Sequence, residues 1–209
     1  MSMAKDLNSK EQRLESDGLS ISYFEAGSGH PVIVFPAKEG ELADPLVRKL
    51  AESHRIISLN LSSRDFASAN QLAEKLPRAL TSIGIGQCSV MGISAGALHA
   101  LALAIAAPEL IDRLILLAPD QLSEDGGSLD FSRVSAATLV LVGTGDRSDA
   151  LEAGRLCRAR IRSCHLSLVY GAGHEMTSER PKVCLEAIGQ FLKEGEQFII
   201  FHESQEIRH

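Results

Sequence analysis

The stretch CSVMGISAG, residues 88–96, decides the fold because two different hydrophobic patterns meet in it at one serine. The residues before Ser94 suit a buried strand, and residues 95–107 form an apolar run that is typical of a buried helix. A strand that turns at once into a helix strains the serine backbone and exposes its hydroxyl. Gly92 and Gly96 lack side chains and so let the strand and the helix approach closely. The stretch therefore predicts a serine nucleophile at a tight strand-to-helix turn.

Outside this stretch, short β-branched runs alternate with helical ones, which is typical of a parallel sheet covered by helices. We expect strands at 32–35, 55–61, 88–91, 114–117, 138–142 and 165–170, and helices at 42–53, 68–82, 95–107, 150–159 and 180–192. Asp17 and Gly18 lie between two alternating runs and predict a hairpin. Pro77 is expected to kink its helix or mark a boundary. The fold class is thus α/β, a mostly parallel central sheet with an antiparallel N-terminal edge and helices on both faces.

The composition is that of an ordinary globular chain, with 209 residues, 44% hydrophobic residues and 23% charged residues. This length suits one domain. We expect a flexible N-terminus at residues 1–10, the folded domain at 11–194 and a C-terminal tail at 195–209. A net charge of −6 without a basic run argues against nucleic acid as a partner, because Lys and Arg supply the affinity for phosphates.

The N-terminus is polar and unlike a secretory leader, and the longest apolar stretch is too short to span a bilayer. The four cysteines have no C-x-x-C spacing and are interpreted as free thiols. We therefore expect a cytoplasmic protein that does not associate with membranes.

Two candidate partners for Ser94 follow later predicted strands. The sequence GTGD ends at Asp146, and GAGH ends at His174. Loops at the carboxyl ends of parallel strands are where sites form in such sheets. A histidine can take the serine proton near neutral pH, and a carboxylate fixes the histidine tautomer and stabilises the imidazolium. The order serine, aspartate, histidine predicts a catalytic triad, with Asp149 as the alternative acid.

With these motifs the chain resembles the α/β-hydrolase-fold family, which has a G-x-S-x-G elbow and the order serine, acid, histidine. The resemblance covers nearly everything from Leu14 to Leu192 and includes the hairpin, the elbow and the segments 29–35, 108–116, 143–146, 171–174, 179–181 and 191–192. It implies a serine hydrolase of the esterase type. It also implies an oxyanion hole formed by the backbone N–H groups of Ala37 and Ala95.

Three features depart from the family pattern. The family usually has His-Gly after the third strand, whereas this chain has Phe35 and Pro36, so the oxyanion donor maps onto Ala37. The fourth strand usually ends in an aspartate, whereas this chain has Asn60. Only residues 119–137 are available for a lid, so we expect no cap domain. Without a lid the site should be broad and shallow, or should be completed by another subunit of a homo-oligomer.

The motifs together predict a serine hydrolase that acts on a carboxylic ester or a related small acyl substrate through an acyl-enzyme. The alternative is a ligand sensor or partner-binding protein with little turnover, motivated by the altered Phe35, Pro36 and Asn60 positions. No cofactor is expected, because the glycines at 84 and 86 precede a strand whereas dinucleotide-binding glycines follow one. No metal is expected, because the histidine at 174 lacks the second histidine of H-E-x-x-H.

Overall fold

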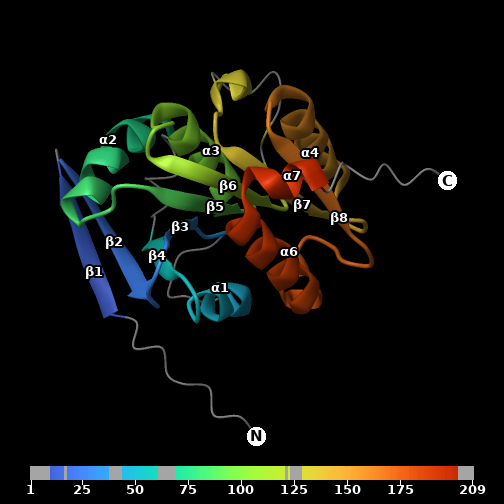
Figure 1. Ribbon diagram of the computed structural model, residues 1–209, viewed down its shortest axis with the longest axis horizontal. Helices are drawn as coiled ribbons and strands as arrows, with labels where there is room; N and C mark the ends of the chain where they lie inside the picture. The colour runs from blue at the N-terminus through green and yellow to red at the C-terminus, as the bar shows by residue number, and fades with distance from the viewer. Residues whose placement is uncertain are drawn as a thin grey trace, which may run out of the picture.

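An eight-stranded sheet runs through the centre of the chain (Figure 1). The computed structural model describes residues 10–16, 18–37, 44–60, 69–120, 122 and 129–201. The strands are β1 (Lys10–Ser16), β2 (Leu19–Ala26), β3 (Pro31–Phe35), β4 (Arg55–Asn60), β5 (Cys88–Ile93), β6 (Ile111–Leu117), β7 (Ala137–Gly143) and β8 (Cys164–Val169). Their order is β1-β2-β4-β3-β5-β6-β7-β8, antiparallel among β1, β2 and β4 and parallel from β4 to β8. The expected mostly parallel sheet with an antiparallel N-terminal edge is confirmed.

Helices cover both faces of the sheet (Figure 1). One face carries α2 (Ala69–Ser82), α3 (Gly96–Ala106) and α4 (Ser148–Arg160). The other face carries α1 (Pro45–Leu50), α5 (Met176–Glu179), α6 (Pro181–Glu194) and α7 (Glu196–Phe201). The expected placement of helices on both faces is therefore confirmed.

The central strands are buried on both sides, which explains their continuous apolar sequences. In β3, Ile33 and Phe35 face the cluster under α2 and α3, whereas Val32 and Val34 face the cluster under α1 and α6. Successive side chains of a strand point to opposite faces, so one short apolar run supplies both layers of core. All residues of β5 are buried, and this rigid strand leads directly to Ser94.

Two helix boundaries differ from the sequence expectation. The helix expected at 42–53 is shorter, because the Leu46 N–H donates to Oδ1 of Asp44 at 2.8 Å and Asp44 caps the helix at its first turn. The sequence left open whether Pro77 kinks its helix or marks a helix boundary. The boundary is wrong, because α2 continues through this residue. Leu76 and Leu80 on either side of Pro77 are fully buried, and their packing against the sheet holds the helix together.

The hairpin predicted at the start of the sheet is present, with Ser16 paired to Leu19 and Gly18 at φ +77°. Asp17 and residues 1–9 of the expected flexible N-terminus lie outside the described residues. Beyond α6 the chain forms α7, whose Phe198 ring packs edge to face against His165 and Phe191. The first part of the expected tail thus packs on the second face of the sheet.

Between β6 and β7, the described residues form only one short 3₁₀ turn, Phe131–Arg133, and no cap domain. Residues 121 and 123–128 of this connection lie outside the described part of the chain. Across the described ranges, none of the helices combines the length and hydropathy needed to cross a bilayer.

Candidate active site

Ser94 occupies the sharp turn between β5 and α3, with a φ of +51°. This left-handed backbone conformation is unfavourable for a residue with a side chain, at a cost of roughly 1–2 kcal/mol. Close packing on both sides holds it: a Cβ on Gly92 would lie 2.6 Å from the Cα of Ala97, and one on Gly96 would overlap the carbonyl oxygen of Phe35. Both glycines are therefore required by close approach, as the sequence predicts.

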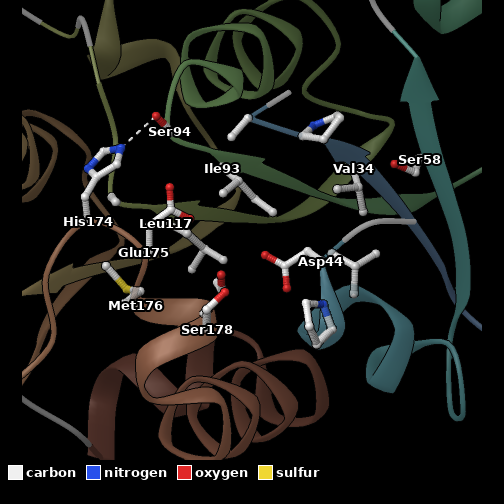
Figure 2. A pocket seen from close by; sticks show the side chains of 16 residues that line it. Val34, Asp44, Ser58, Ile93, Ser94, Leu117, His174, Glu175, Met176 and Ser178 are labelled. Atoms are coloured by element: carbon white, nitrogen blue, oxygen red, sulfur yellow. Dashed lines mark hydrogen bonds between the residues drawn. The ribbon is translucent and has the colours of Figure 1, made fainter. Parts of the chain in front are cut away.

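His174 joins the other two predicted site residues. Its Nε2 lies 2.9 Å from Oγ of Ser94 (Figure 2), and its Nδ1 lies 3.0 Å from Oδ1 of Asp146. A carboxylate has no proton to donate, so Nδ1 carries the hydrogen and the lone pair of Nε2 faces the serine hydroxyl. The structure therefore brings these residues together in one hydrogen-bonded line. The alternative acid, Asp149, lies outside this line, with its Oδ1 accepting from the Ala150 N–H.

The acid and the histidine come together because their two loops are hydrogen-bonded to each other. The Gly145 N–H donates to the Ala172 carbonyl at 2.8 Å, and the Gly171 N–H donates to Oγ1 of Thr144 at 3.0 Å. A Cβ on Gly143 would overlap the Ala172 carbonyl oxygen, so only glycine permits this approach. The glycines of the GTGD and GAGH motifs thus serve the pairing of the loops.

Asp146 is the most enclosed member of the line. Its side chain is 0% exposed, against 29% for His174. Its Oδ1 accepts a second hydrogen bond, from the Arg147 N–H at 2.7 Å, whereas its buried Oδ2 has no partner among the described residues. The negative charge of a carboxylate buried in this way is stabilised most when the neighbouring imidazole is positively charged.

An ion pair beside the site was not predicted from the sequence. The guanidinium of Arg147 lies 3.0 Å from Oδ1 of Asp120 and 3.3 Å from Oδ1 of Asp149. The Asp120 N–H in turn donates to the carbonyl of Ser94 at 3.4 Å. This pair therefore links the loop after β6 to the loop that carries the acid. An arginine directly after the candidate acid is the one sequence feature that could have indicated it.

The two predicted oxyanion donors follow two neighbouring parallel strands, β3 and β5. Ala37 follows β3 and is exposed, and Ala95 precedes α3. Within the described ranges, neither backbone N–H takes part in a backbone hydrogen bond. Both groups are therefore available to a developing negative charge, which is what an oxyanion hole requires.

A pocket of ≈310 Å³ opens beside Ser94 and His174 (Figure 2). Its lining residues come from the strand ends, α1 and α5, and they are Val34, Pro36, Ala37, Asp44, Pro45, Val47, Ser58, Ile93, Ser94, Leu117, Ala118, His174, Glu175, Met176, Thr177 and Ser178. Both α1 and α5 contribute to the walls of this pocket, and α5 was not predicted from the sequence.

The cysteines do not offer a competing nucleophile. All four are free and buried. Burial raises the pKa of Cys88 to about 12 and that of Cys184 to about 11, so these thiols stay protonated at neutral pH. In the described part of the chain, no group of three or more His, Cys, Asp or Glu side chains could hold a metal ion.

Comparison of the sequence with protein-family models and with curated proteins finds no match. Solved structures of similar fold include MGS-MChE2, an α/β hydrolase from a sediment metagenome, with a TM-score of 0.72 and 16% identity over 88% of this chain and 98% of that one. Naproxen esterase from Bacillus subtilis has a TM-score of 0.74 and 14% identity over 90% and 92%. A membrane phospholipase A described as a bacterial virulence factor has a TM-score of 0.75 and 17% identity over 88% and 86%. At these identities the similarity shows the fold, which is the α/β-hydrolase fold.

Proposed function

We propose that this α/β-hydrolase-fold chain is a serine hydrolase that cleaves a carboxylic ester or a related small acyl substrate. The observation that carries the proposal is the hydrogen-bonded line from Ser94 through His174 to Asp146, which starts at a strained elbow beside a pocket. Two of the similar structures belong to an esterase and to a phospholipase, which supports hydrolysis as the reaction class.

In the first half of the reaction, Nε2 of His174 takes the hydroxyl proton while Oγ of Ser94 attacks the substrate carbonyl carbon. The negative charge that develops on the carbonyl oxygen is held by the N–H groups of Ala37 and Ala95. His174 then gives its proton to the leaving alcohol, and an acyl-enzyme remains on Ser94. In the second half, a water molecule loses a proton to His174 and attacks the acyl carbon, which releases the acid and restores the serine.

Asp146 supports both halves of this reaction without reacting itself. Its Oδ1 keeps the proton of His174 on Nδ1, so that Nε2 always faces Ser94 as a base. Its charge also stabilises the imidazolium that exists between the two proton transfers. We place the reaction in the cytoplasm, because four free thiols suit a reducing compartment.

A fluorophosphonate probe tests the proposal directly, because an activated serine displaces fluoride from its phosphorus. We expect rapid labelling of the native protein and none of Ser94→Ala. The variant Ser82→Ala, at an exposed serine on α2, is the matched control and should label like the native chain. A folded native protein that resists labelling would instead favour the second candidate function, a ligand sensor with little turnover.

A further inference from the structure

We propose that the pocket beside Ser94 selects substrates that carry a positively charged ammonium group, and that Asp44 binds this group. The inference rests on the proposed function, because it concerns the substrate that Ser94 would cleave. It names a substrate class and a specificity-determining residue that caps α1.

The pocket places the nucleophile and a carboxylate on different walls. Ser94 and His174 lie at one side, and the carboxylate of Asp44 points into the hollow from the start of α1 (Figure 2). Apolar side chains, including Ile93 and Leu117, lie between them (Figure 2). An aliphatic chain bound along these residues could join a reacting ester at Ser94 to a polar group at Asp44.

Within the described part of the chain, one oxygen of Asp44 is left to bind such a group. Oδ1 accepts the Leu46 N–H at 2.8 Å, whereas Oδ2 has no hydrogen-bond partner among the described residues. Capping does not by itself require a charge, because asparagine and serine cap helices about as well as aspartate. The carboxylate also neutralises the positive end of the helix, which would otherwise attract an anion.

The charges of the pocket favour the same class of ligand. Of its described lining residues, Asp44 and Glu175 are acidic, and none is a lysine or an arginine. The remaining polar side chains are the hydroxyls of four residues and the imidazole of the candidate base, and they belong to Ser58, Ser94, Thr177, Ser178 and His174. A small hollow lined by one sign of charge attracts ligands of the opposite sign and disfavours carboxylates and phosphates.

The size of the pocket suits a short chain. A volume of ≈310 Å³ lies at the lower end of the roughly 300–1,000 Å³ range of ligand pockets. A short ω-ammonio chain suits a pocket of this size.

The test compares p-nitrophenyl esters that differ only at the end of the acyl chain: 6-ammoniohexanoyl, its neutral isostere heptanoyl and the anionic pimeloyl ester. Either the acyl half or the alcohol half of an ester could enter the pocket. A second pair of esters therefore carries the ammonium or the methyl group at the end of the alcohol; these are the butyrate esters of 6-aminohexanol and heptanol. In at least one of the two sets, we expect the ammonium ester to have a kcat/KM on the order of ten to a hundred times that of its neutral isostere.

Asp44→Asn removes the charge and keeps a helix cap, so this preference should fall to near unity. Asp44→Ser is the second variant, used if the first does not fold. Glu109→Gln removes the same charge from an exposed turn outside the pocket and should keep the native ratio. Fluorophosphonate labelling is measured on the same preparations.

Labelling of Ser94 without an ammonium preference in either set would overturn the inference and leave the proposed function standing. A preference that persists in both Asp44 variants would also overturn it, because another group would then bind the cation. If a folded protein neither labels nor turns over any ester, the proposed function fails and this inference fails with it.

Discussion

At the scale of single residues, Asp146 makes both of its hydrogen bonds to described residues through one oxygen. Oδ1 accepts from both His174 and the Arg147 N–H, and the side chain is fully enclosed. This arrangement fixes which imidazole nitrogen is free to act as a base. A change that keeps the size of the residue but loses its charge should therefore affect turnover far more than folding.

Asp146→Asn tests this point. We expect the variant to stay folded and kcat for a short p-nitrophenyl ester to fall by about 10³–10⁴, because an amide can stabilise the wrong histidine tautomer and carries no charge for the imidazolium. Asp149→Asn is the matched control, since Asp149 is exposed and lies outside the line. If kcat fell as far in Asp149→Asn as in Asp146→Asn, the assignment of Asp146 as the acid would be wrong.

At the scale of elements, the strand-to-helix elbow depends on how closely α3 approaches β3. A Cβ on Gly96 would overlap the carbonyl oxygen of Phe35, which belongs to a buried strand and cannot move freely. Gly189, within α6, has open space where its Cβ would lie. The same substitution at these two helical glycines should therefore have opposite effects.

We expect Gly96→Ala to lower the free energy of unfolding by about 1–3 kcal/mol and to displace Ser94, with a corresponding loss of activity. Gly189→Ala should raise the free energy of unfolding by up to about 1 kcal/mol, because alanine favours a helix over glycine. Urea denaturation followed by circular dichroism measures both changes. If Gly96→Ala left the free energy of unfolding unchanged, the elbow would not be tightly packed.

The elbow and the members of the hydrogen-bonded line were predictable because each is encoded locally. Ser94, Asp146 and His174 each follow a recognisable strand, and parallel strands bring their carboxyl ends to one edge of the sheet. The far wall of the pocket was not predictable in this way. Asp44 caps α1 and Met176 begins α5, and no local pattern shows that these short helices contribute to the pocket beside Ser94.

At the scale of the whole molecule, the two layers of core enclose all four cysteines. Cys88, Cys157 and Cys164 lie in the layer under α2, α3 and α4, whereas Cys184 lies in the layer under α1 and α6. Burial raises the pKa of each thiol, to about 12 for Cys88 and Cys164 and to about 11 for Cys184. In the unfolded chain these groups ionise near their ordinary pKa, which makes folding sensitive to alkali.

The sign of this effect follows from proton linkage. Below about pH 9 the thiols are protonated in both states, so they do not make stability depend on pH. Between about pH 9 and 11 the unfolded chain loses thiol protons that the folded chain keeps, so the unfolding free energy falls by about 1.4 kcal/mol per pH unit for each such thiol. Cys88→Ala should lessen this slope by one thiol's contribution, measured by urea denaturation from pH 9 to 11. An unchanged slope would show that Cys88 ionises equally in the folded and unfolded chain, which its full burial in β5 argues against.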